Sequence, residues 1–318
     1  MADRWLEVSI RAAAEAAEAL TALFERWGHS GVVIEPELAQ GHDEDDAQPA
    51  PGGFSILRTY LRAGHDLKSR RAKLEEAVGI LRAFDLAPMD ALQSRWLDED
   101  DWANAWKQHY QVQRIGRKWV VKPRWQEYQP RPADRIVELD PGMAFGTGLH
   151  PTTQLMLEYL EDLADAGEVA GRRVLDLGTG SGILSIGAAR LGASVLALDV
   201  EEVAVSAAAK NVANNGLSSS IDVRHATLGD SIDSVVPVRG LDFAGAFDGI
   251  LANIVTRVIA ERAPAIARAL RHSGWLIASG IIVDREHEAV AALATQGLPV
   301  AERRQLGDWV ALLCRTRS

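Results

Sequence analysis

Three glycines at alternate positions follow a short apolar run near the middle of the chain. Their type and spacing point to chemistry more directly than any other residues do. The run 174–177 carries Asp176 and leads into Gly178, Gly180 and Gly182. A buried parallel strand that ends in a glycine-rich turn lets backbone N–H groups approach a ligand closely. A dinucleotide-binding turn would have its third glycine at position 183, where this chain has Ile183. The spacing therefore predicts a ligand site at a strand end and does not favour a dehydrogenase.

Two carboxylates accompany this turn. Asp176 precedes it directly, and a carboxylate at that place suits an amino group better than a pyrophosphate. Asp199 ends the next apolar run about 20 residues after the first glycine, where an α/β nucleotide site holds the ribose hydroxyls. Taken alone, Asp199 is equally a solvated acid or a cap for a helix that starts near Glu201. Together with the glycine spacing, the two acids predict a site for S-adenosylmethionine.

Asn253 follows a further apolar run, 247–252, and is expected at the tip of a strand in the same sheet. Methyl transfer is an in-line displacement, so the nucleophile needs a lone pair close to the sulfonium carbon. A lysine amine has an ordinary pKa of about 10.4 and must first lose a proton. Asn253 can orient such an amine without adding charge, and the following Ile254–Val255–Thr256 lacks the aromatic platform on which a base would stack. These residues favour an aliphatic amine, positioned by Asn253, with water taking the proton.

A dense run of glycine, proline and threonine occupies residues 139–153, just before a helical pattern. Threonine hydroxyls at a helix start are usually caps, so spacing alone favours a capping role for Thr153 over ligand binding. His150 is expected to form a local hydrogen bond rather than to act as a base.

Helical and strand patterns alternate around these motifs. We expect helices near 152–166, 183–191 and 202–215, and strands at 172–177, 194–198, 221–225, 247–252 and 274–279. Residues 298–305 and 309–316 are expected to form a closing antiparallel pair. This alternation predicts a parallel sheet that binds its ligand at the carboxyl ends of the strands.

The first 95 residues follow a different pattern, in which four short strand-like runs and two helical stripes occur in the order βαββαβ. This order predicts a ferredoxin-like sandwich. Residues 37–52 within it are acidic and rich in proline and glycine, which predicts a loop. No catalytic set of residues stands out in 1–95, so we interpret this domain as a substrate-recognition module. The alternative is a purely structural appendage.

Five of the nine tryptophans lie between residues 96 and 125. Trp102, Trp106 and Tyr110 recur every four positions and would share one face of a helix. Such a stripe is more often core packing than a ligand cage. We therefore expect an aromatic-rich linker over 96–130 and a catalytic domain over 131–318.

Composition narrows the class of protein. With 318 residues, 47% of them hydrophobic, the chain is long enough for two domains with sizeable cores. Cys314 is the single cysteine, so no internal disulfide can form and a reducing environment is expected. The chain begins without an apolar signal core and has no run long enough to cross a membrane. These features predict a cytoplasmic protein without a membrane contact. We also expect a monomer and no metal site, although composition does not determine the oligomeric state. The net charge of −10 makes nucleic acid a poor partner and a basic protein a plausible one.

The combination of motifs resembles one family. Residues Pro141 to Gly148, the following His150 to Thr153, the glycine turn and Ala252–Asn253–Ile254 are similar to the PrmA methyltransferases, which modify the eleventh protein of the large ribosomal subunit. Two tryptophan-containing stretches, 101–107 and 122–125, and the ferredoxin-like module extend the resemblance over nearly the whole chain. The acidic stretch 37–52 does not match the family pattern.

This resemblance implies a class-one S-adenosylmethionine methyltransferase, an α/β protein with a Rossmann-like seven-stranded sheet in which one strand is reversed. It places the cofactor contacts on Thr153, Gly178, Asp199 and Asn253, and Gly180 of the same turn is expected to join them. The expected function is N-methylation of amino groups, on lysine side chains or the N-terminal amine, of a ribosomal protein of the large subunit. The alternatives are a small-molecule or nucleic-acid methyltransferase on the same fold, and a non-catalytic ribosome-assembly binding protein.

Overall fold

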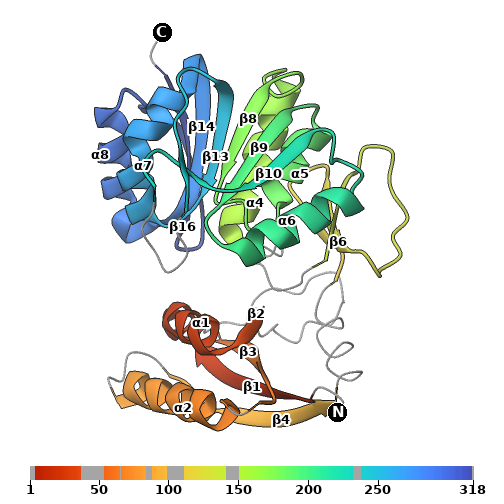
Figure 1. Cartoon of the computed structure of the whole chain (residues 1–318), viewed down its shortest axis with the longest axis vertical. Coiled ribbons are helices and arrows are strands. Elements are labelled where there is room, and N and C mark those ends of the chain that lie inside the picture. The colour runs from red at the N-terminus through yellow and green to blue at the C-terminus, as the bar shows by residue number, and fades with distance from the viewer. Residues whose placement is uncertain are drawn as a thin grey trace. The chain divides into compact units, whose positions relative to one another are not determined.

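The chain divides into two units, Met1–Tyr110 and Gln111–Ser318, in this computed structural model (Figure 1). The structure describes residues 4–36, 54–64, 66–83, 88–98, 111–140, 150–231 and 238–316. The acidic stretch 37–52, the stripe of Trp102, Trp106 and Tyr110, and the motif residues 141–149 lie outside the described residues.

The first unit has the predicted βαββαβ order. Its elements are β1 (Arg4–Ala13), α1 (Ala14–Trp27), β2 (His29–Pro36), β3 (Phe54–Arg62), α2 (Leu67–Ala83) and β4 (Gln93–Asp98). The strands form one sheet in the order β2-β3-β1-β4, and every pairing is antiparallel. Successive side chains of a strand point to opposite faces, so Leu6, Val8 and Ile10 of β1 share one face, where they join Phe24 of α1 and Leu74 of α2 in a core. This unit therefore has a hydrophobic core of its own.

A small three-stranded sheet begins the second unit. It consists of β5 (Gln113–Ile115), β6 (Trp119–Pro123) and β7 (Arg135–Leu139), with β5 antiparallel and β7 parallel to β6. The described parts of the expected linker 96–130 therefore include regular structure: Trp96 belongs to β4, and residues 113–123 form two strands. Trp119 is fully buried, and its indole N–H donates to the carbonyl of Leu157 over 2.8 Å. This tryptophan is part of the core of the second unit.

The main sheet of the second unit has seven strands in the order β10-β9-β8-β13-β14-β16-β15. They are β8 (Arg173–Leu177), β9 (Ser194–Asp199), β10 (Ile221–His225), β13 (Phe247–Asn253), β14 (Leu270–Ile282), β15 (Val300–Leu306) and β16 (Trp309–Arg315). Only β16 is reversed among the parallel strands, since its pairings with β14 and β15 are antiparallel. The expected seven-stranded sheet with one reversed strand is confirmed. Its central strands are largely apolar because helices cover both faces.

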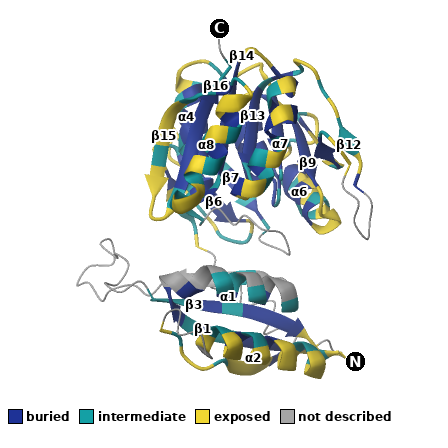
Figure 2. Cartoon of the chain, turned by 90° about the vertical axis from the view of Figure 1, so that its left-hand side faces the viewer, coloured by how far each residue is buried: buried dark blue, intermediate teal, exposed yellow. Residues whose placement is uncertain are grey.

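Helices pack on the two faces of this sheet (Figure 1), and most of the strands between them are coloured as buried (Figure 2). One core joins residues of α4 (Pro151–Asp165), α5 (Ile183–Arg190) and α6 (Glu202–Asn214) to the sheet, and a second joins those of α7 (Thr256–Ala269) and α8 (Glu286–Thr295). A short two-stranded sheet, β11 (Thr227–Leu228) and β12 (Gly240–Leu241), and the 3-10 turn η2 (Val283–Arg285) complete the described elements. The ends of β8, β9 and β13 meet at one edge, where the residues singled out from the sequence lie.

Candidate functional site

The glycine turn after β8 is held tightly between two neighbouring strand ends. Gly178, Gly180 and Gly182 all have left-handed backbone conformations, with φ of 76°, 55° and 83°. The N–H groups of Gly178 and Thr179 both donate to the carbonyl of Leu198 in β9, over 2.9 and 3.0 Å. A Cβ atom on Gly178 would lie 2.4 Å from Cγ2 of Ile254, the residue after β13. Only glycine fits here, and its N–H is used to bind the turn to β9.

Asp199 is joined to this turn through its side chain. One carboxylate oxygen accepts from the backbone N–H of Gly180 over 2.8 Å, and the other accepts from the N–H of Glu201 over 3.0 Å. Glu201 is the N-cap of α6, so Asp199 contributes to the helix start and also contacts the turn. A helix-capping role and a ribose-binding role, both considered for Asp199 from the sequence, are therefore compatible. A carboxylate oxygen has two lone pairs and can accept further donors.

Thr153 and Asn253 meet at the same edge. Thr153 lies in the first turn of α4 with 1% of its surface exposed, and Asn253 is the last residue of β13. The amide Nδ2 of Asn253 donates to the Thr153 hydroxyl over 3.3 Å. The expected capping role of Thr153 is not what the structure shows, because the N-cap of α4 is His150, whose ring accepts from the N–H of Thr152. The Thr153 hydroxyl is thus directed toward a strand end that is distant in sequence.

His150 forms a local hydrogen bond, as the sequence predicted. Its Nδ1 lies 2.7 Å from the hydroxyl oxygen of Thr152, and its ring packs edge-on against Trp309 with centroids 4.6 Å apart. Burial lowers the pKa of His150 to about 4, so the imidazole is neutral near neutral pH. A neutral ring adds no positive charge to this edge of the sheet.

Asp176 lies beneath the glycine turn rather than on its surface. The residue has no exposed surface, and one of its oxygens accepts from the hydroxyls of Thr179 and Ser185 over 2.7 and 2.6 Å. Burial raises the pKa of this carboxyl to about 6. The sequence favoured a ligand amino group as its partner, whereas the structure gives it two protein hydroxyls.

An asparagine of α6, Asn211, and the asparagine that caps its end, Asn215, form a connection that was not predicted. Asn211 accepts from the N–H of Asp140 over 2.9 Å and donates to the carbonyl of Ser181 over 2.9 Å. Asn215, one turn later, bonds both backbone groups of Glu138 in β7. The available signal was a pair of amides four residues apart in a helix of small apolar residues, since such spacing places both on one face. These asparagines fix the glycine turn against the end of β7.

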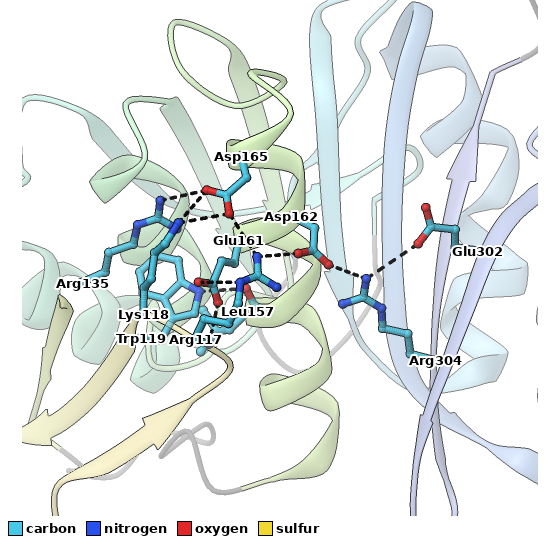
Figure 3. A network of polar contacts seen from close by, with 10 residues as sticks. All are labelled: Arg117, Lys118, Trp119, Arg135, Leu157, Glu161, Asp162, Asp165, Glu302 and Arg304. Carbon is cyan, nitrogen blue, oxygen red and sulfur yellow. Dashed lines mark hydrogen bonds and ion pairs between the residues drawn. The ribbon is translucent and has the colours of Figure 1, made fainter. Parts of the chain in front are cut away.

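A charged network holds the other end of α4 (Figure 3). Lys118 Nζ lies 2.8 Å from an oxygen of Asp165, and Arg117 Nη2 lies 2.7 Å from an oxygen of Asp162. Arg304 of β15 binds the second oxygen of Asp162 over 2.5 Å. Hydrogen bonds from Lys118 and then Arg117 lower the pKa of Asp165. The network fixes α4 against two sheets, and the same helix carries Thr153 at its start.

Within the described ranges no three His, Cys, Asp or Glu side chains come together in a way that could hold a metal ion. No helix in that part of the chain is both long and apolar enough to cross a bilayer.

Comparison with known proteins identifies similar chains. The family model described as "Ribosomal protein L11 methyltransferase (PrmA)" matches residues 4–317. A ribosomal protein L11 methyltransferase of Chloroflexus aurantiacus is 42% identical over 327 residues, which cover 98% of each chain. One from Herpetosiphon aurantiacus is 40% identical over 323 residues, covering 98% of this chain and 99% of that one. The solved ribosomal protein L11 methylase from Lactobacillus delbrueckii subsp. bulgaricus superposes with a TM-score of 0.56 at 34% identity, covering 65% of this chain and all of that one.

Proposed function

We propose that this chain, which belongs to the family of ribosomal protein L11 methyltransferases (PrmA), transfers methyl groups from S-adenosylmethionine to amino groups of ribosomal protein L11. The chain is a methyltransferase by this membership, and the class-one fold agrees with it. The choice of amino groups and the assignment of the site residues are our proposal.

The observation that carries the proposal is the convergence of three strand ends on one glycine turn. Gly178 leaves no room for a side chain beside Ile254, Gly180 binds Asp199, and Asn253 binds Thr153. A tight glycine turn at a strand end, flanked by a carboxylate one strand away, fits an adenosyl ligand. We assign cofactor binding to Thr153, Gly178, Gly180, Asp199 and Asn253.

Asn253 is well placed to orient the substrate amine. The cofactor supplies a methyl group on a positively charged sulfur when it is bound. Because Nδ2 of Asn253 is directed to Thr153, its Oδ1 is the atom suited to accept an N–H from a neutral amine. The amine lone pair can then be aligned for in-line attack. Water takes the proton that the ammonium form must lose beforehand.

The surroundings favour an aliphatic amine over a nucleobase. After Asn253 come Ile254 and Val255, and Val255 has 61% of its surface exposed. A branched aliphatic side chain offers no flat aromatic face on which a base can stack. His150, at the start of the helix that carries Thr153, is neutral and therefore does not repel a positively charged protein.

We assign substrate recognition to the N-terminal domain, residues 1–95, and catalysis to residues 131–318, joined by 96–130. The first unit has its own core, and the residues of the proposed site all belong to the second. The monomeric state, the cytoplasmic location and the absence of a required nucleic acid contact stay predictions from the sequence.

Transfer of a labelled methyl group tests the proposal. The full chain is incubated with methyl-labelled S-adenosylmethionine and a mixture of ribosomal proteins and ribosomal RNA, which are then separated. We expect the label in L11 for the native chain and a strong reduction for Asn253→Ala. Label in RNA alone would favour a nucleic-acid methyltransferase. No transfer despite cofactor binding would favour a non-catalytic ribosome-assembly binding protein.

A further inference from the structure

A buried carboxylate beneath the glycine turn has a role that cofactor contact does not explain. Asp176 has no exposed surface, and its Oδ2 accepts from the hydroxyls of Thr179 and Ser185. Its Oδ1 is also buried, and no hydrogen-bond partner for it occurs in the described part of the chain. A buried charge with an unsatisfied oxygen is costly, so a structural reason for its presence is expected.

The two hydroxyls belong to opposite ends of the turn. Thr179 lies between Gly178 and Gly180, whereas Ser185 lies in the first turn of α5, which begins at Ile183. Both are buried, with 5% and 0% of their surfaces exposed, and their hydroxyl oxygens are 3.1 Å apart. A single oxygen of Asp176 therefore fixes where the turn begins and where it enters the helix.

The charge state of Asp176 decides whether this arrangement can form. An ionised carboxylate accepts from both hydroxyls. A proton on Oδ2 would compete with one of them, because that oxygen would become a donor. A proton on Oδ1 would weaken the acceptor and place a donor where no partner has been found. Protonation therefore loosens the link between the turn and α5.

The surroundings of this carboxyl shift its pKa toward neutral pH. Burial raises its pKa to about 6, while the donors Ser185 and Thr179 oppose that rise, and the negative charge of Asp199 adds to it. The residues that lie beside Asp176 in the sheet register are Ala197 of β9 and Leu251 of β13, which are apolar.

We propose that Asp176 is a positioning residue for the glycine turn, and that binding of the positively charged cofactor at that turn expels a proton from its carboxyl group. This inference rests on the proposed function, because it assumes that S-adenosylmethionine binds there. The cofactor's sulfonium and ammonium charges stabilise a nearby carboxylate. The O–H bond of the acid breaks, the proton passes to the buffer, and the carboxylate retains the two hydroxyl donors that this structure shows on its Oδ2.

Calorimetric titration measures this proton directly. The full chain is titrated with S-adenosylmethionine in two buffers of different ionisation enthalpy, and the difference in heat gives the protons released. At about pH 6 we expect the native chain to release roughly half a proton per site more than Asp176→Asn does, and at about pH 8 we expect no difference between the two, since the carboxyl is already ionised. S-adenosylhomocysteine, whose sulfur is uncharged, should release fewer protons at the lower pH.

Variants test whether the released proton comes from Asp176 or from another group. Asp176→Asn should bind the cofactor without this proton release, while the control Asp222→Asn, on the exposed part of β10, should keep it. If Asp176→Asn does not fold, Ser185→Ala serves instead. It removes one donor to the carboxylate and should move the release to higher pH. Cofactor binding without proton release at pH 6, or unchanged release in Asp176→Asn or Ser185→Ala, overturns the inference and leaves the proposed function standing. Absence of cofactor binding by the native chain contradicts the proposed function itself.

Discussion

The side-chain amide of Asn253 donates to the hydroxyl of Thr153 over 3.3 Å, although the two residues are 100 positions apart in the chain. The bond joins the first turn of α4 to the last residue of β13. The far end of α4 is fixed by the network around Asp162 and Asp165, so the helix cannot readily shift away from the strand. The orientation of the Asn253 amide is therefore set before any ligand binds.

Removing the hydrogen bond between Asn253 and Thr153 should slow methyl transfer. Thr153→Val keeps the shape of the side chain but loses the hydroxyl that orients Asn253, and Asn253→Ala loses the amide itself. Because misplacement of a reacting group by about 1 Å costs about 100-fold in rate, we expect kcat to fall by up to that factor in Asn253→Ala and less in Thr153→Val.

The matched control is Thr227→Val, since Thr227 is also buried but belongs to β11. Steady-state kinetics with L11 provide the measurement. Equal kcat values for all three variants and the native chain would remove Asn253 from the proposed machinery.

Asp199 should contribute to cofactor affinity. Asp199→Ala removes the proposed acceptor for the ribose hydroxyls and the bond to the N–H of Gly180. We expect binding of S-adenosylmethionine to weaken by about 1–3 kcal/mol, the usual cost of leaving buried polar groups unpaired. Calorimetry on Asp199→Ala and on Asp222→Ala provides the comparison, and equal affinities in the two variants would argue against a ribose contact.

Several elements around the site could be predicted from sequence because their signals are local. Buried parallel strands appear as apolar runs, so 194–198 and 247–252 correspond closely to β9 and β13. The antiparallel pair predicted at 298–305 and 309–316 corresponds to β15 and β16, of which only β16 is a buried apolar run. The glycine turn was recognisable because its backbone conformation and the contact with Ile254 require glycine.

Other features depend on contacts between distant residues and could not be predicted in this way. The partner of Thr153 is in another element, and the usual capping preference pointed to the wrong role. Tryptophan clustering suggested a linker, while Trp119 is buried against α4 through its bond to Leu157. The burial of Asp176 follows from helix α5 covering the strand end, which residue type alone does not indicate.

A side chain at position 280 should be tolerated as poorly as one in the glycine turn. The φ of Gly280 is 82°, and a Cβ atom would lie 2.5 Å from the carbonyl oxygen of Ile254, next to Asn253. Gly297 has a similar φ of 77° but nothing within 4 Å of such an atom. We expect Gly297→Ala to lose about 1–2 kcal/mol of unfolding free energy through backbone strain alone.

Gly280→Ala should lose more stability than Gly297→Ala and should also weaken cofactor binding. Denaturant unfolding and calorimetry on both variants give the answer. If the two substitutions have equal effects on both quantities, the close approach of β14 to Ile254 has no importance for the site.

His150 should make the protein sensitive to acid. Its pKa is lowered to about 4, whereas a histidine in the unfolded chain titrates at about 6.5. Below the latter value the unfolded state takes up a proton that the folded state does not, so the folded state loses stability as the pH falls. From about pH 7 to pH 5 this loss amounts to about 2 kcal/mol.

His150→Asn retains an acceptor for the start of α4 and removes the titrating ring. The pH dependence of unfolding should therefore be shallower in this variant. The comparison is made as variant minus native at each pH, because the raised pKa of Asp176 has the opposite sign, stabilising the folded state at low pH. A difference that does not change with pH would show that His150 has an ordinary pKa.

The central claim is that this site methylates amino groups of L11, and the mass of L11 after reaction tests it most directly. Purified L11 is incubated with S-adenosylmethionine and either the native chain or Asn253→Ala, and is then analysed intact and as fragments by mass spectrometry. We predict that the native chain raises the mass of L11 in steps of one methyl group, on lysine side chains or the N-terminal amine, and that Asn253→Ala does so far more slowly. An unchanged mass of L11 with an enzyme that binds the cofactor, or methyl groups on atoms other than amine nitrogens, would contradict the account.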